Sequence, residues 1–119
     1  MSEGKKLDDG KPRYDLIPAL ALHEYVMALT FGAEKYGPQN WRLVNCWQDR
    51  YFAAAQRHLW EYRRAQQAIW SPNDKDPTDK LSQKRDSESG LHHLAHAMAC
   101  ISFILELELS FTESVAGLD

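Results

Sequence analysis

The segment from Asp86 to Glu108 constrains the fold more than any other part of the chain, because it is long, apolar and free of proline. Asp86 or Ser87 is a suitable N-cap, and the carboxylate of Glu88 suits a first helical turn. The apolar residues of one face recur at helical spacing, namely Leu91, Leu94, Ala95, Met98, Ile101 and Leu105. A helix that is apolar on most of its surface must be buried. The sequence therefore predicts a helix from about residue 87 to about residue 111 that packs among other helices.

The first two turns of this predicted helix carry polar groups. Three histidines and two carboxylates lie close together in the sequence, namely His92, His93, His96, Asp86 and Glu88. Residues three or four apart share a helix face, so His93 can meet His96 and Glu88 can meet His92. Buried polar groups need partners, and imidazole with carboxylate is a common metal-binding set. We therefore expect a ligand or catalytic role for these residues, with a purely structural histidine network as the alternative.

Composition indicates a single domain with an ordinary polar surface. The 119 residues suffice for one core, and 44% of them are hydrophobic while 26% are charged. The formal net charge of −3 argues against binding to a nucleic acid polymer, which favours a basic surplus. Cys46 and Cys100 lack metal-type spacing and are expected to be free thiols in a reducing compartment. Because we find no signal peptide and no uninterrupted apolar stretch long enough to span a bilayer, we expect a cytoplasmic location without membrane association.

The rest of the chain predicts two more long helices and no strand. The first covers residues 19–36 and is stopped by Gly37 and Pro38, and the second runs from residue 47 to about residue 68. Segment 39–45 is predicted to be a loop, as is the polar segment 71–85 with its two prolines. We predict an all-α bundle of three long helices plus short terminal elements, as one domain over residues 1–119. Apolar stripes on more than one side of these helices predict that a homo-oligomer completes the core.

Two pairs of charged residues outside the apolar helix are candidates for binding. Glu34 and Lys35 end the first predicted helix, where the helix dipole disfavours a carboxylate, so a cation near Glu34 would resolve the conflict. Lys35 could meet a phosphate as a point charge. Lys11 and Arg13 flank a rigid proline and suit an anionic ligand. The alternative for Glu34 and Lys35 is an exposed pair at a helix end without a ligand. The alternative for Lys11 and Arg13 is a solvated N-terminal segment.

His58 and Glu61 lie three residues apart on one face of the second predicted helix. Either both belong to a site, or His58 is a core histidine and Glu61 pairs with Arg57 or Arg64 at the surface. No nucleophile motif, phosphate-binding loop or dinucleotide-binding turn accompanies these residues. The residues by themselves leave both alternatives open.

Four motifs follow one another between about Lys6 and Leu107. They are Gly10-Lys11-Pro12-Arg13 with Asp15-Leu16-Ile17-Pro18, Phe31 to Gly37 with Asn40-Trp41, Arg57-His58-Leu59, and Asp86-x-Glu88-Ser89-Gly90-x-x-His93-Leu94-x-His96. Together they resemble the phage dATP/dGTP diphosphohydrolase family, within the wider MazG-like all-α NTP pyrophosphohydrolases. The resemblance implies an oligomeric helical enzyme that uses Mg²⁺ or Mn²⁺ to cut a purine deoxynucleoside triphosphate into monophosphate and pyrophosphate. It also implies a role in phage nucleotide-pool control or 2-aminoadenine DNA synthesis, in the host cytoplasm.

With this resemblance, each candidate residue receives an expected role. The candidate metal ligands are Glu34, His58, Glu61, Glu88, His93 and His96. Water would attack the α-phosphorus, and Glu34 or Glu61 would accept its proton. The residues expected to bind substrate are Lys11, Arg13, Lys35 and Arg57 at the phosphates, Asn40 at the edge of the base and Trp41 stacked on it.

The chain departs from the MazG-like pattern at its metal ligands. MazG-like enzymes carry Glu-x-x-Glu on one helix and Glu-x-x-Asp on the next, where this chain has His58-x-x-Glu61 and His93-x-x-His96. Mg²⁺ prefers oxygen ligands, whereas imidazole favours Mn²⁺, Co²⁺, Ni²⁺ or Zn²⁺. We expect Mg²⁺ or Mn²⁺, with Co²⁺ among the alternatives. Two other classes stay open: a metal-dependent phosphohydrolase that releases triphosphate or phosphate, and a non-enzymatic oligomeric helical protein.

Overall fold

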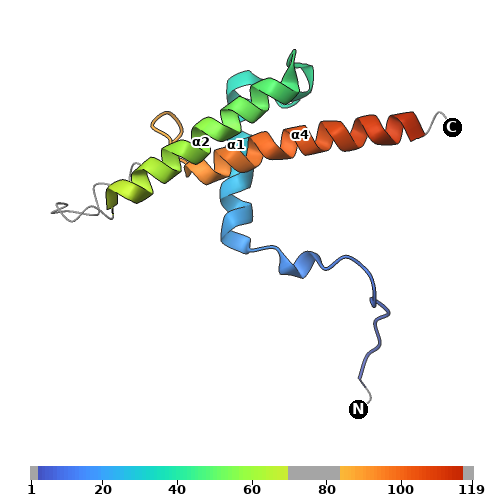
Figure 1. The fold of residues 1–119 in the computed structure, drawn as a ribbon. Coiled ribbons are helices and arrows are strands. Elements are labelled where there is room, and N and C mark those ends of the chain that lie inside the picture. Colours follow the sequence, from blue (N-terminus) through green and yellow to red (C-terminus); the bar gives the residue numbers. More distant parts are fainter. Residues whose placement is uncertain (1–2, 70–83, 117–119) are drawn as a thin grey trace.

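A computed structural model of the chain describes residues 3–69 and 84–116 and shows an all-α fold (Figure 1). In chain order the elements are the 3-10 helix η1 (Tyr14–Leu16), α1 (Ala19–Tyr36), the 3-10 helix η2 (Asn40–Leu43), α2 (Trp47–Ile69) and α4 (His93–Ala116). Across these described ranges there is no strand, and an isolated bridge joins Arg85 to His92. The predicted fold class is confirmed. Most of the predicted loop 71–85 lies outside the described residues.

The bounds of α1 and α2 agree with the prediction because local signals set them. Pro18 precedes α1 in an extended conformation, where its missing N–H costs nothing. At the other end, Gly37 has a φ of 96°, which glycine adopts without strain, and its N–H donates to the carbonyl of Ala33 at 2.8 Å. The 3-10 helix η2 lies within the predicted loop that follows.

The start of α4 was predicted wrongly, because the helix begins at His93 and not near residue 87. Asp86 does not cap a helix: its Oδ1 accepts hydrogen bonds from the N–H groups of Glu88 at 3.0 Å and Ser89 at 2.8 Å, which forms a tight turn. Gly90 continues this turn with a φ of 74°. The ring of His92 caps α4 instead, since its Nδ1 accepts the N–H of Leu94 at 3.0 Å. Glu88 and His92 are therefore not neighbours on a helix face.

Small side chains form the core. α2 and α4 pack along each other, and α1 packs against α4 (Figure 1). The buried apolar residues are all alanines: Ala28, Ala55, Ala65, Ala95, Ala97 and Ala99. Alanine lets helix backbones approach closely, but each side chain buries little apolar area. Larger residues are only partly buried against the cluster of Ala28, Ala95 and Ala99, among them Tyr25, Leu29, Leu91 and Phe103.

The prediction that α4 is buried on most sides was wrong for the single chain. Met98, Ile101 and Leu105 of the predicted inward stripe are 41%, 49% and 56% exposed. The C-terminal half of α4, which carries Leu105, extends beyond the other helices (Figure 1). The radius of gyration is 19.1 Å, against about 13.5 Å for a compact domain of this length.

By length and composition, the stretch His93–Thr112 of α4 is apolar enough to cross a bilayer. The sequence analysis found no uninterrupted apolar stretch of this length, and Glu106 and Glu108 do interrupt this one, whereas a hydropathy average over the helix tolerates them. Core helices of water-soluble proteins meet the same criterion. Here His93 and His96 at the start of the helix make polar contacts with α2 and with the preceding turn.

Candidate functional site

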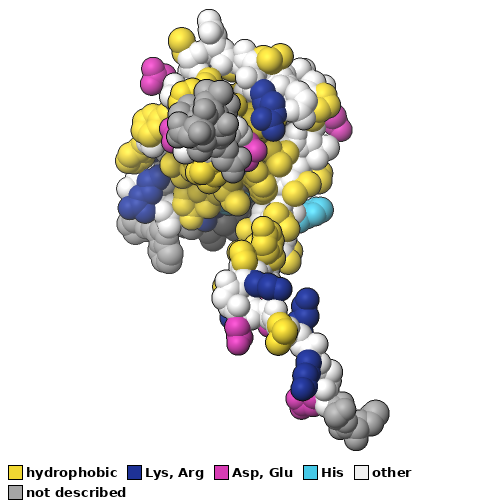
Figure 2. Space-filling view, turned by 90° about the vertical axis from the view of Figure 1, so that its right-hand side faces the viewer, with side chains coloured by type: hydrophobic (Ala, Val, Ile, Leu, Met, Phe, Trp, Pro, Cys, Tyr) yellow, Lys and Arg dark blue, Asp and Glu magenta, His cyan; other side chains and the backbone are white. Residues whose placement is uncertain are grey.

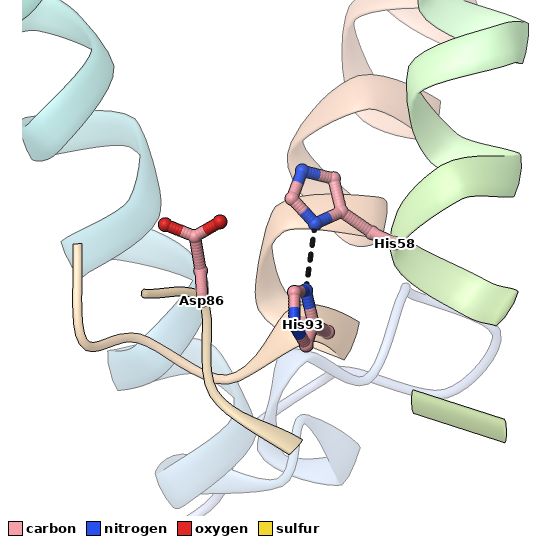
Figure 3. A group of neighbouring side chains, drawn as sticks. All are labelled: His58, Asp86 and His93. Atoms are coloured by element: carbon pink, nitrogen blue, oxygen red, sulfur yellow. Dashed lines mark hydrogen bonds between the residues drawn. The ribbon is translucent and has the colours of Figure 1, made fainter. Parts of the chain in front are cut away.

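Three side chains from separate parts of the chain form a group that could hold a metal ion (Figure 3). His58 comes from the middle of α2, Asp86 from the turn before α4, and His93 from the first position of α4. One ligand atom from each lies within 4.8 Å of the other two. The Nδ1 atoms of His58 and His93 are 2.9 Å apart, a hydrogen-bond distance that requires one ring to donate.

His96 extends this group by one helical turn. Its ring stacks on His58 at a centroid distance of 4.8 Å and meets the edge of Phe31 at 6.1 Å. Its Nε2 lies 2.6 Å from the hydroxyl of Ser89, which also accepts the N–H of Leu91 at 3.1 Å. The turn that displaces the start of α4 therefore also positions His96.

The environment keeps the three imidazoles neutral at pH 7. Burial, followed by the neighbouring rings of His96 and His93, lowers the pKa of His58 to about 4. Burial likewise lowers the pKa of His93 and that of His96. For Asp86 burial acts to raise the pKa, but the N–H groups and hydroxyl of the turn outweigh it, so that this pKa is lowered. Neutral imidazole and ionised carboxylate are the forms that bind metals.

The group could hold a divalent metal ion. A metal–nitrogen bond is about 2.1 Å long, so two nitrogens bound at a right angle lie about 3 Å apart. The two Nδ1 atoms are 2.9 Å apart but hydrogen-bond to each other, so an ion shared by them would have to replace that hydrogen bond. Two nitrogens and one carboxylate favour Mn²⁺, Co²⁺, Ni²⁺ or Zn²⁺ over Mg²⁺.

A cavity of about 1000 Å³ opens beside this group. His58, Asp86 and His96 line the cavity, whereas His93 does not line it but contacts His58. Of the residues predicted to bind metal or substrate, those that line the cavity are Lys35, Asn40, Trp41, Arg57, His58, Glu88 and His96. The cavity therefore combines imidazole, carboxylate and basic side chains from α1, α2, η2 and the turn.

Three predicted carboxylate ligands lie outside the three-residue group. Glu34 is exposed and does not line the cavity, although Ala33 and Lys35 beside it do. Glu61 forms an ion pair with Arg64 one turn further along α2, which is the surface alternative for this residue. Glu88 lines the cavity, but its carboxylate pairs with Lys35 Nζ at 2.7 Å.

Asp86 is the carboxylate that lies with the histidines; the sequence analysis counted it among the residues expected to have a ligand or catalytic role but did not include it among the metal ligands. The signal that was available is the spacing Asp-x-x-Ser-Gly, in which an aspartate side chain can close a turn that glycine completes. Such a turn places a carboxylate oxygen of Asp86 within 4.8 Å of ring nitrogens of His58 and His93.

The aromatic and N-terminal candidates are placed differently from expectation. The indole of Trp41 stacks on Phe103 at 4.7 Å and lies 4.3 Å from the guanidinium of Arg42, so a base could stack there only after one of them moved. Lys11 and Arg13 lie on the exposed N-terminal segment and do not line the cavity.

Comparison with known proteins agrees with the motifs. The family model described as "dATP/dGTP diphosphohydrolase, N-terminal" matches residues 1–115. The chain belongs to this family. A curated relative, the "dATP/dGTP diphosphohydrolase" of Salmonella phage PMBT28, is 32% identical over 104 residues, which cover 87% of this chain and 29% of the relative. No solved structure matches. The family inferred from the motifs is thus confirmed, and the chain spans less than a third of the relative's length.

Proposed function

We propose that this chain carries a metal-dependent hydrolase site for purine deoxynucleoside triphosphates, dATP or dGTP. The observation that carries the proposal is the group of His58, Asp86 and His93 at the edge of a cavity of about 1000 Å³. A volume of this size accommodates a nucleotide. The substrate class comes from the name of the phage relative and the products from the MazG-like resemblance.

In this proposal His58, Asp86 and His93 hold the metal, with Mn²⁺ the best match to their nitrogen and oxygen atoms. The metal would supply positive charge at the phosphates and a more acidic water. Arg57 lines the cavity one residue before His58 and makes no ion pair with any residue that the structure describes. We assign it to the phosphates, together with Lys35.

The proton of the attacking water needs an acceptor that faces the cavity. His96 and Glu88 both line it, whereas Glu34 and Glu61 do not. A neutral imidazole can accept a proton at pH 7, and the hydroxyl of Ser89 holds the ring of His96 in place. We therefore propose His96, with Glu88 as the second choice, for this role. Phage nucleotide-pool control or 2-aminoadenine DNA synthesis, in the host cytoplasm, is the proposed biological setting.

Product analysis tests this function. The protein is incubated with dGTP or dATP and Mn²⁺, and the nucleotides are separated by anion-exchange chromatography. We expect monophosphate and pyrophosphate, and we expect EDTA to abolish the reaction. Release of triphosphate, or of diphosphate and phosphate, would assign the site to the other class of phosphohydrolase. Absence of turnover with both substrates would reject the proposal for this chain.

A further inference from the structure

Two of the three residues that could hold a metal ion each follow directly after a residue that Glu24 of α1 contacts. Glu24 Oε2 accepts the backbone N–H of His92 at 3.2 Å and lies 3.7 Å from Nη1 of Arg85. His93 follows His92, and Asp86 follows Arg85. Glu24 itself does not line the cavity and does not belong to the three-residue group. Any influence of its carboxylate on the group therefore acts through these two neighbours.

Arg85 and His92 close the turn before α4 at its two ends. The two residues form the isolated antiparallel bridge, and between them the N–H of Asp86 donates to the carbonyl of Leu91 at 2.7 Å. Nη1 of Arg85 also donates to the carbonyl of Gly90 at 3.0 Å. The turn is thus a closed unit with hydrogen bonds of its own, and contacts from other elements decide where it lies.

The hydrogen bond from His92 to Glu24 ties this closed turn to α1 and joins residues 68 positions apart in the chain. The N–H of His92 lies at the start of α4, where backbone donors have no acceptor within the helix. A carboxylate at this end of a helix also interacts favourably with the helix dipole. The ring of His92 lies 5.6 Å from the ring of Tyr62 in α2. His92 is therefore held against α1 through its backbone and against α2 through its side chain.

Glu24 differs from charged side chains that stand alone on the surface. On the face drawn in Figure 2, charged side chains are scattered among hydrophobic ones. Glu24 instead has a backbone donor and a guanidinium within reach of one carboxylate oxygen. Exposed ion pairs contribute little to stability, and the side chains of Glu24 and Arg85 are 34% and 52% exposed. We therefore expect loss of the Glu24 carboxylate to affect the position of the turn more than the stability of the fold.

We propose that Glu24 is a positioning residue, which holds the turn so that Asp86 and His93 lie beside His58. The inference rests on the proposed function, because it concerns the group that would hold the metal there. It adds a side chain of α1 to a group whose members come from α2, α4 and the turn. Metal ligands depend on such supporting contacts for their orientation, and loss of one typically weakens metal affinity about 10–100-fold.

The affinity of the full chain for Mn²⁺ alone, measured from the electron paramagnetic resonance signal of unbound Mn²⁺, tests this role. Glu24→Ala removes the acceptor for the N–H of His92 and should weaken Mn²⁺ binding about 10–100-fold. Glu24→Gln keeps an acceptor oxygen at this place and should recover most of the lost affinity. The matched control is Glu108→Ala, which removes an exposed carboxylate of α4 outside the cavity and should bind Mn²⁺ like wild type. All three variants should keep the helical circular dichroism spectrum of wild type.

Backbone hydrogen exchange tests the same role without metal. In Glu24→Ala the amides of segment 84–92 should exchange faster than in wild type, because the turn has lost its contact with α1. The amides of α1 and α2 should exchange at the wild-type rate, and so should those of the turn in Glu108→Ala.

Wild-type Mn²⁺ affinity in Glu24→Ala, or unchanged exchange of segment 84–92 in this variant, would overturn the inference. Faster exchange across all the helices, with a loss of affinity that Glu24→Gln does not recover, would also overturn it, since that result describes a general loss of stability. If wild type itself does not bind Mn²⁺, the proposed function is rejected, and the exchange rates alone then decide whether Glu24 holds the turn.

Discussion

The substitution His93→Asn separates a metal site from a structural histidine network. In the structure His93 is 7% exposed and its Nδ1 is 2.9 Å from that of His58. An asparagine amide can still hydrogen-bond to His58, but it is a weak metal ligand. The variant should therefore keep most of its metal-free stability and lose most of its response to Mn²⁺.

The size of the effect follows from the three-ligand geometry. Metal that binds only the folded chain stabilises it by about 2.7 kcal/mol at one hundred times Kd. Loss of a residue that merely orients a ligand weakens metal affinity about 10–100-fold, and loss of a ligand should cost at least the upper end. At the same Mn²⁺ concentration the variant would gain only about 0.4 kcal/mol. For a chain of this size this predicts a Tm increase of about 10 °C for wild type and about 2 °C for the variant.

The assay is a thermal melt followed by circular dichroism at pH 7.5, with and without Mn²⁺. His23→Asn is the matched control, because His23 is an exposed histidine of α1 outside the group and should leave the full Mn²⁺ response. An equal rise in Tm for His93→Asn and wild type would refute the metal site at these residues. Together with a low metal-free Tm for the variant, it would favour the structural network.

Three further measurements test the site. Without metal, the free energy of unfolding should fall as the pH drops from 6.5 toward 4, because the unfolded chain protonates His58 at its ordinary pKa of 6.5 and the folded chain only near 4. The loss at pH 5 should be roughly 1 kcal/mol after allowance for the partial exposure of His58. A urea-unfolding midpoint that does not change over this pH range would contradict the prediction. Arg57→Ala should raise KM for dGTP about 10–100-fold, as expected for a lost charge-assisted hydrogen bond, while Arg63→Ala should leave it unchanged, and equal KM values would remove Arg57 from the phosphate site. Glu34→Gln should keep turnover within about threefold of wild type, because its side chain does not line the cavity, and a drop of 100-fold or more, typical for a general base, would restore it as a catalytic candidate.

The helices that the sequence predicted correctly are those with local start and stop signals. Pro18 and Gly37 bound α1, and both act through their own backbone geometry. Local start and stop signals did not predict where α4 begins. An aspartate can cap a helix or close a turn, depending on which backbone N–H groups its side chain accepts. Here Asp86 accepts those of Glu88 and Ser89 and closes a turn.

The candidate site likewise has residues that the sequence could predict and residues that only the tertiary structure brings together. The residues alone made His93 and His96 candidates, because histidines on an apolar helix stand out, whereas His58 became a candidate ligand through the family resemblance. The choice among the carboxylates needed the tertiary structure, since Glu34, Glu61, Glu88 and Asp86 have similar chemistry and differ in what surrounds them. Glu61 pairs with Arg64 one turn away and Glu88 pairs with Lys35, whereas Asp86 has a carboxylate oxygen within 4.8 Å of the nitrogens of His58 and His93.

The sequence by itself determined the all-α class, the family and the limits of α1 and α2, because helical periodicity, capping residues and motif order are local properties. Only the tertiary structure decided which carboxylate joins the histidines and which apolar faces stay exposed. Both depend on the distance between residues far apart in the chain, and helical spacing carries no information about that distance. Met98, Ile101 and Leu105 have the pattern of a buried face, yet no other part of the described chain covers them.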